Sequence, residues 1–112
     1  MALPKSEVMY GTLDLLVLKT LEALGPLHGY AIAGRIHQVS RELLRLNQGT
    51  LYPALLRLEH NGWINSKWGT TENNRKARYY AITKSGRKRL TEEAGNWEQM
   101  AEIINRVLAG SF

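Results

Sequence analysis

The chain has 112 residues and no cysteine, so disulfides and thiolate metal sites are excluded. Its three histidines, His28, His37 and His60, are too scattered for a helical or hairpin metal site. We therefore expect no metal ion and no cofactor, and we interpret His28 as a capping or connector residue. No apolar run is long enough to cross a bilayer, and the N-terminus lacks the apolar core of a signal peptide. The simplest interpretation is a cytoplasmic protein that does not contact a membrane.

Recognisable catalytic sets are also lacking. The sequence has no Ser/His/Asp set, no glycine-rich phosphate loop and no nucleophile with a base at an informative spacing. Two adjacent acids, Glu92 and Glu93, are better explained as a solvated pair early in a helix, where the helix dipole favours negative charge. An enzyme is therefore the least favoured class of function.

Acidic residues are nearly absent from one segment of the chain. Between Trp63 and Arg89, eight lysines and arginines stand against a single acid, Glu72. The formal charge of the whole chain is only +5, so the excess of positive charge is local. A charge run is usually a solvated face, but an imbalance this local favours a polyanionic partner, and double-stranded DNA is the leading candidate.

The segment 47–62, just before this basic stretch, has the signals of one short helix. Thr50 is the expected N-cap, Pro53 fits the first turn, and Gly62 supplies a left-handed stop. Leucines at spacings of four and three predict one buried stripe, made of Leu51, Leu55 and Leu58. Because the other faces are left for a partner, we expect this helix to lie in the major groove of DNA.

The order of the remaining elements places this helix in a larger unit. Periodicity and turn residues predict helices over 12–24 and 30–39, a short strand over 44–46, and strands over 63–68 and 77–83 around a polar tip. In the second helix, Val39 is expected to point inward with Ile32 and Ile36. Helix, helix, short strand, helix and hairpin is the order of a winged helix-turn-helix domain, a mainly α (α+β) fold.

The last segment, 84–108, predicts a helix that is long for so small a protein, with Thr83 or Ser85 as its cap. Steps of four and three define a heptad seam of six residues: Leu90, Ala94, Trp97, Ala101, Ile104 and Leu108. We infer a winged-helix DNA-binding domain over 1–83 and a C-terminal dimerisation helix over 84–112, so that the partner is a second copy of the chain. The alternative is a helix folded back onto its own domain.

Three motifs stand out in the sequence: GPLHGY at 25–30, GTLYPALLRLE at 49–59 and RKARYY at 75–80. Together they resemble the PadR family of bacterial transcriptional regulators, in particular its short members with a single C-terminal helix. The resemblance implies a winged-helix homodimer that represses transcription from a palindromic operator. Some short members also bind flat aromatic molecules between the subunits against a tryptophan of the last helix, and Trp97 is the position here that matches.

The candidate DNA contacts lie in the proposed groove helix, just before it and in the hairpin. They are Gln48, Thr50, Tyr52, Arg57, Arg75, Lys76 and Arg78. Residues near the start of the helix usually reach base edges, whereas Arg57 and the hairpin bases are expected to meet phosphates. Packing against the wing is the alternative for Tyr52. Lys5 and Ser6 form either an arm near the DNA backbone or a tail.

Two further hypotheses compete with a sequence-specific repressor. One is a ligand-responsive regulator in which a flat aromatic effector at Trp97 releases DNA, which requires tighter binding of the effector to the free dimer. The other is a non-specific architectural DNA binder. Alternation along the hairpin also predicts that only one of Tyr79 and Tyr80 belongs to the core.

Overall fold

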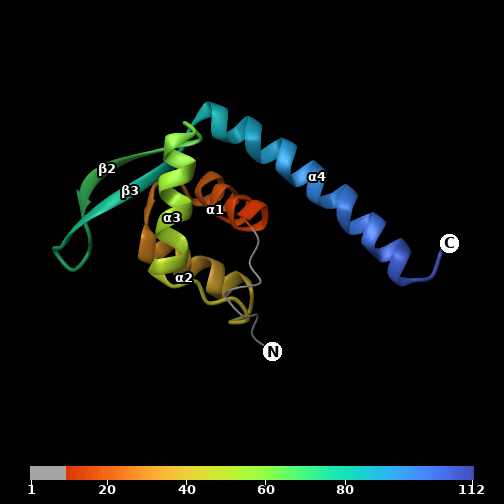
Figure 1. Cartoon of the computed structure of the whole chain (residues 1–112). Coiled ribbons are helices and arrows are strands. Elements are labelled where there is room, and N and C mark those ends of the chain that lie inside the picture. The colour runs from red at the N-terminus through yellow and green to blue at the C-terminus, as the bar shows by residue number, and fades with distance from the viewer. Residues whose placement is uncertain (1–9) are drawn as a thin grey trace.

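The computed structural model describes residues 10–112, so the expectation for Lys5 and Ser6 lies outside the described part of the chain. Figure 1 shows the earlier helices packed together, a β-hairpin on one side and a long last helix that leaves on the other. In chain order the elements are α1 (Tyr10–Leu24), β1 (Leu27–His28), α2 (Gly29–Val39), α3 (Gln48–His60), β2 (Ile64–Thr70), β3 (Lys76–Ile82) and α4 (Lys84–Leu108). The predicted winged helix-turn-helix fold is confirmed.

The core lies between α1, α2 and α3 and is closed by the root of the hairpin. The leucine stripe of α3 is confirmed, since Leu51, Leu55 and Leu58 are at most 1% exposed. They pack in one cluster with the buried face of α1 and with Ile32 and Ile36 of α2. The inward placement of Val39 was wrong, because this side chain at the end of α2 is 81% exposed.

The sheet differs from the expectation in one strand. Its order is β1-β3-β2 with both pairings antiparallel, and β1 (Leu27–His28) is a strand that the sequence did not predict. The predicted strand over 44–46 was wrong. Left-handed backbone at Arg41 and Glu42 turns the chain there, and Leu44 and Leu46 bury their side chains from an irregular loop. Their alternation reflects burial without strand pairing.

The helix caps follow local side-chain chemistry. The N-cap of α3 is Asn47, whose Oδ1 accepts the Thr50 amide at 2.8 Å, so the expectation of a Thr50 cap was wrong. Both residue types are good caps, and the helix takes the earlier one, which starts it before Thr50. His28 caps α2 as expected, because its Nδ1 accepts the Ala31 amide at 3.3 Å.

The end of α3 and the start of α4 are joined by a compact set of contacts among Gly62, Trp63, Thr83 and Gly86, called the clasp below. Gly62, in the left-handed conformation with φ of 77°, ends α3 as predicted. The Thr83 hydroxyl donates to the Gly62 carbonyl at 2.7 Å and accepts the Gly86 amide at 3.0 Å, and the Thr83 amide donates to the Trp63 carbonyl at 3.0 Å. Thr83 is thus the N-cap of α4 and a tether to α3 at once.

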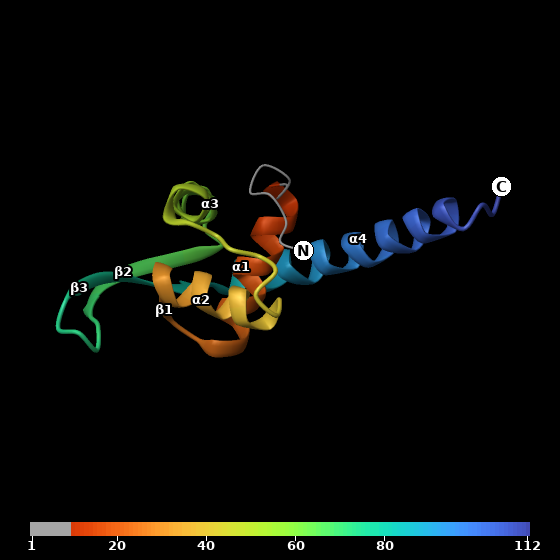
Figure 2. The same cartoon turned by 90° about the horizontal axis from the view of Figure 1, so that it is seen from below.

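Beyond the clasp, α4 has a packed part and a projecting part. Leu90 is 5% exposed and belongs to the core, so the first turns of α4 are continuous with the winged-helix body. Further along, the helix runs away from the body on the side opposite the wing in both views (Figures 1 and 2). The radius of gyration of 15.3 Å exceeds the ~13 Å of a compact domain of this length because of this projection. Within residues 10–112, no helix is long and apolar enough to cross a membrane.

An ion pair fastens α3 to α1. The guanidinium of Arg57 on α3 bonds the carboxylate of Asp14 on α1, which is only 15% exposed. Burial raises the pKa of Asp14 above its usual value, while the hydrogen bond and charge of Arg57 lower it. Arg57 therefore offsets part of the effect of burial on this carboxyl.

The clasp predicts a large effect of one methyl group. A Cβ at Gly86 would lie 2.0 Å from the Trp63 carbonyl oxygen, so Gly86→Ala must displace the root of α4. We expect a loss of at least about 2 kcal/mol in the free energy of unfolding, measured by urea denaturation. The control is Gly34→Ala in α2, where nothing lies within 4 Å and a gain of up to about 1 kcal/mol is expected. Equal stability of the two variants would contradict the clasp.

The Asp14–Arg57 pair predicts a pH-dependent loss of stability in Arg57→Met. Without Arg57 the pKa of Asp14 rises further, and a carboxyl with a raised native pKa stabilises the fold when protonated and loses this contribution as pH rises. The loss of unfolding free energy in the variant relative to wild type should therefore grow as pH rises from the usual titration range of a carboxyl toward neutrality, measured by urea titrations. In the double variant Arg57→Met/Asp14→Asn the deficit should be nearly constant. A constant deficit in the single variant would contradict this assignment.

Candidate nucleic-acid interface

The outward side of α3 is an exposed row opposite its leucine stripe. Tyr52 is 49% and Leu56 is 48% exposed, and Gly49, Pro53 and His60 are exposed along the same side. In Figure 2 this helix is seen nearly end-on above the hairpin, so it stands out from the body instead of being covered by another element. A helix supported from behind and bare in front has the placement of the second helix of a helix-turn-helix, which enters the major groove.

The start of α3 brings together two of the predicted contacts. Gln48 and Thr50 are half-buried there, in the first turn. A Cβ on Gly29 would lie 2.9 Å from the Gln48 Oε1, so the glycine leaves the space that this carboxamide occupies. The first turns of α2 and α3 are therefore neighbours, as they are in helix-turn-helix domains whose first helix meets the DNA backbone. Tyr30, also at the start of α2, is 77% exposed.

Arg57 does not match its expectation. Its guanidinium is engaged by Asp14, so its charge is offset within the chain, whereas the sequence predicted a side chain available to a phosphate. The partner carboxylate is 43 positions away in sequence, and no local pattern links the two residues. The structure assigns Arg57 the role of holding α3 in place.

The wing carries its charge on two differently placed sets of side chains. Arg75 and Lys76 at the tip are exposed, as a phosphate contact requires. Arg78 is half-buried instead: its Nε donates to the Ser66 hydroxyl at 2.9 Å, and its guanidinium lies 5.2 Å from the ring centre of Trp68. The three wing bases named from the sequence are therefore not equivalent.

Ser66 connects the wing to α3. Its hydroxyl donates to Glu59 Oε2 at 2.6 Å while it accepts from Arg78, so a chain of bonds runs from the helix through β2 to β3. Burial raises the pKa of the Tyr80 phenol, the negative charge of Glu59 on α3 adds to this shift, and the positive charge of Arg78 opposes it. The orientation of the wing is therefore tied to the helix beside it. Tyr80 is the core tyrosine of the Tyr79–Tyr80 pair, 3% exposed.

Two exposed apolar residues were missed by the sequence interpretation. Trp68 is 66% exposed on the wing, directly opposite Arg78 in the strand register. It shares a strand face with Ile64 and Ser66, the residues that point to the core and to α3, so it lies on the α3 side of the hairpin. Alternation counted from Ile64 would have found it. Leu56, on the outward row of α3, has the chemistry to contact a thymine methyl.

The predicted seam of α4 divides at the point where the helix leaves the body. Leu90 was wrongly placed in a dimer seam, because its side chain is already buried in its own domain. The next members, Ala94 and Ala101, are half-buried, whereas Trp97 is 54%, Ile104 48% and Leu108 79% exposed. Met100, Ile103 and Val107 beside them are about half exposed as well. The outer part of the helix, 96–108, thus offers a continuous apolar face.

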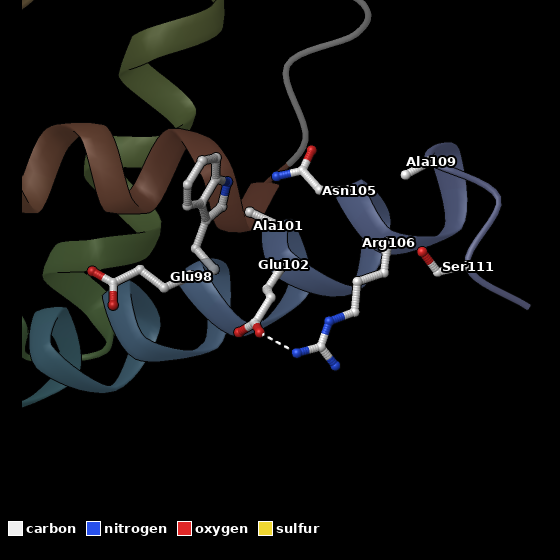
Figure 3. A pocket seen from close by; sticks show the side chains of 8 residues that line it. Glu98, Ala101, Glu102, Asn105, Arg106, Ala109 and Ser111 are labelled. Atoms are coloured by element: carbon white, nitrogen blue, oxygen red, sulfur yellow. Dashed lines mark hydrogen bonds and ion pairs between the residues drawn. The ribbon is translucent and has the colours of Figure 1, made fainter.

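An open hollow of about 500 Å³ lies along this outer part (Figure 3). Trp97 and Ala101 contribute to it, and the ion pair of Glu102 with Arg106, 2.6 Å long, runs along one side. All of the lining residues come from the outer part of α4 and the few residues after it. In the single chain the hollow is therefore lined on one side by α4 and open on the other.

Comparison with known proteins agrees with this geometry. Residues 17–92 match the model of the transcriptional regulator PadR-like family. A transcriptional regulator from Clostridium thermocellum is 35% identical and superposes with a TM-score of 0.80, covering 89% of this chain and 96% of that one. A PadR family transcriptional regulator from Eggerthella lenta is 30% identical with a TM-score of 0.76, covering 88% and 82%.

A curated relative adds to the same assignment. A transcriptional regulator of Mycobacterium tuberculosis is 39% identical over 67 residues, which cover 60% of this chain and 62% of that protein. The matched family is one of DNA-binding proteins without enzymatic activity, in keeping with a groove helix, a basic wing and no catalytic set. The chain belongs to the PadR-like family of transcriptional regulators.

Proposed function

We propose that the protein is a homodimeric repressor that binds a palindromic operator. The observation that carries the proposal is the apolar face of α4 over 96–108, which projects from the DNA-binding body. Exposed apolar side chains recur on it at heptad spacing, and isolated helices with such a face are stabilised by a partner helix. A second copy is the simplest partner, because two-fold dimers are the commonest assemblies of soluble proteins.

A two-fold dimer gives a palindrome its physical meaning. The two α3 helices would enter major grooves about one helical turn, ~34 Å, apart, each reading the same half-site. Gln48, Thr50 and Tyr52 at the start of α3 are the proposed base-reading residues. Arg75 and Lys76 are the proposed phosphate contacts of the wing, with Arg78 acting mainly through Ser66 to orient it. Occupancy of such a site near a promoter would exclude the transcription machinery.

The proposal predicts that dimerisation and operator affinity are lost together. Ile104→Asp/Leu108→Asp places two charges on the apolar face, so the variant should sediment as a monomer while retaining its fold. Its affinity for the paired site upstream of its own gene should fall at least ~100-fold, because the second half-site no longer benefits from linkage. Fluorescence anisotropy with labelled duplexes measures this at fixed salt concentration.

The controls separate specificity from attraction by charge. A scrambled duplex of the same composition should bind the wild type much more weakly than the upstream site. Gln99→Asp adds a charge at an exposed position of the same helix that lies outside the seam and the hollow, and it should leave both mass and affinity unchanged. Equal affinity for the scrambled and upstream duplexes would favour the non-specific architectural binder. A dimer that survives both aspartates would show that another surface holds the two chains.

The hollow beside Trp97 supports a second candidate function, in which a flat aromatic effector binds between the subunits. The Trp97 indole and two alanines line it together with polar side chains of α4, and the second helix of the proposed dimer would cover its open side. Such an effector would release DNA only by binding the free dimer more tightly than the bound one.

The effector hypothesis predicts that a planar aromatic dye quenches tryptophan fluorescence in the wild type and not in Trp97→Ala. Saturating dye should also weaken binding of the upstream duplex by the wild type. Trp68→Phe is the control, since it removes an exposed tryptophan far from the hollow and should keep the quenching. Undiminished DNA affinity at saturating dye would remove this site as a regulatory one.

A further inference from the structure

We propose that Gly95 sets how far apart the half-sites of an operator can lie, by acting as the compliant point between the DNA-reading body and the dimerising part of α4. The inference rests on the proposed homodimer and goes beyond it, because it assigns a specificity role to a residue that contacts neither DNA nor the predicted seam. It follows from where α4 is held, where it is bare and which residues stand at the boundary.

The first turns of α4 cannot move independently of α3. The clasp joins Thr83 to Gly62 and Trp63 by hydrogen bonds of 2.7 and 3.0 Å. Arg89 lies 4.6 Å from the ring centre of Trp63 and pairs with Glu93 at 2.5 Å, and Leu90 is buried against the core. Residues 84–93 therefore move as one piece with the helix that reads DNA.

Beyond Ala94 the residues of α4 become exposed, and no later residue of this helix is buried. Ala94 is half-buried, whereas the side chains over 95–100 are all exposed, and Trp97 is already 54% exposed. In the proposed dimer the part over 96–108 is immobilised by its partner helix. Any adjustment between the dimer body and either DNA-reading unit must then occur in the short stretch between these two fixed parts.

Gly95 occupies that stretch, and nothing in the described part of the chain requires a glycine there. A Cβ at Gly95 would have no atom of residues 10–112 within 4 Å, and the residue continues a regular helix without a positive φ. Glycine in a helix interior lowers helix stability because its backbone has more freedom to lose, and the next residue, Asn96, is also a weak helix former. Two adjacent residues of low helix propensity thus lie at the boundary between the two fixed parts of the 25-residue helix.

DNA geometry explains why such a point matters. Moving a half-site by one base pair shifts it by ~3.4 Å and rotates it by roughly 35° about the duplex axis. A dimer with a stiff α4 binds half-sites at only one spacing. A dimer with a flexible point in each α4 can also bind half-sites whose spacing differs by one base pair, because the helix bends or twists there. Gly95 is therefore expected to broaden the set of operators that the protein accepts.

The experiment measures binding as a function of half-site spacing with full-length wild type, Gly95→Ala and Thr91→Ala. Probes carry the half-sites that footprinting of the wild type defines, at the natural spacing and with one base pair inserted or removed. Thr91→Ala is the matched control, because this exposed position in the fixed part of α4 also gains helix propensity without touching the boundary. Dissociation constants come from anisotropy at one salt concentration, and subunit mass comes from sedimentation.

The expected result is that Gly95→Ala remains dimeric and binds the natural spacing as well as the wild type does. Its penalty for a one-base-pair change should exceed that of the wild type at least ~fivefold, the effect of restoring ordinary helix stability at one residue. Thr91→Ala should reproduce the wild-type profile. A Gly95→Ala profile identical to wild type would overturn the inference, and so would equal narrowing in Thr91→Ala.

Failure of the dimer proposal itself would look different. A monomeric wild type, or one that ignores half-site pairing, would overturn the proposed function and the spacing role together. A wild-type dimer whose Gly95→Ala variant dissociates would leave the proposed function standing and overturn the inference, because the glycine would then serve close approach of the partner helix.

Discussion

The clasp is the constraint on which the rest of the structure depends. Thr83, the N-cap of α4, donates hydrogen bonds to the carbonyls of Gly62 and Trp63 just after α3. The proposed groove helix α3 and the projecting helix α4 therefore have a fixed relative orientation. Thr83 satisfies two needs with one hydroxyl, since it caps α4 and tethers the Gly62 carbonyl. Gly86 allows the approach, because any side chain there would collide with the Trp63 carbonyl. Without this joint, a long terminal helix would have no defined direction.

Further contacts fix the other sides of α3. Its leucine stripe is in the core, Arg57 pairs with Asp14 of α1, and Glu59 reaches the wing through Ser66. None of these contacts involves a residue of the exposed outward row. The outward side of α3 can therefore remain exposed, while the core, the clasp, Asp14 and the wing hold the helix in place. A helix that is ordered before it meets a partner binds more tightly, because ordering it on binding would cost affinity.

Much of the fold could be predicted from local patterns, because heptad steps, glycine stops and capping residues act over a few positions. The bounds of α4, the Thr83 cap and the leucine stripe of α3 are of this kind. Errors arose where distant residues decide. Leu27–His28 forms a strand because β3 lies beside it, and Leu44 and Leu46 are buried without one. Leu90 fits the seam by spacing, yet α4 is still attached to its own body at that position.

For the candidate site, too, local patterns were predictive and contacts between distant residues were not. The charge pattern led to exposed bases at Arg75 and Lys76, but it could not show that Arg57 and Arg78 are engaged within the chain. Trp68 was missed because a tryptophan in a strand is usually interpreted as a core residue. The hairpin extends past the core at this position, so the side chain is exposed. The boundary at Gly95 likewise becomes visible only when the packing of α4 is known.

The absence of native cysteine makes the central claim directly measurable. A spin label on His60→Cys, at the exposed end of α3, reports the separation of the two labels by pulsed electron resonance. A dimer with paired α3 helices should give one intermolecular distance on the order of 34 Å. The distribution around this distance should become narrower when the upstream duplex is added. An absence of any intermolecular distance, with or without DNA, would contradict a dimer that presents paired α3 helices to one duplex.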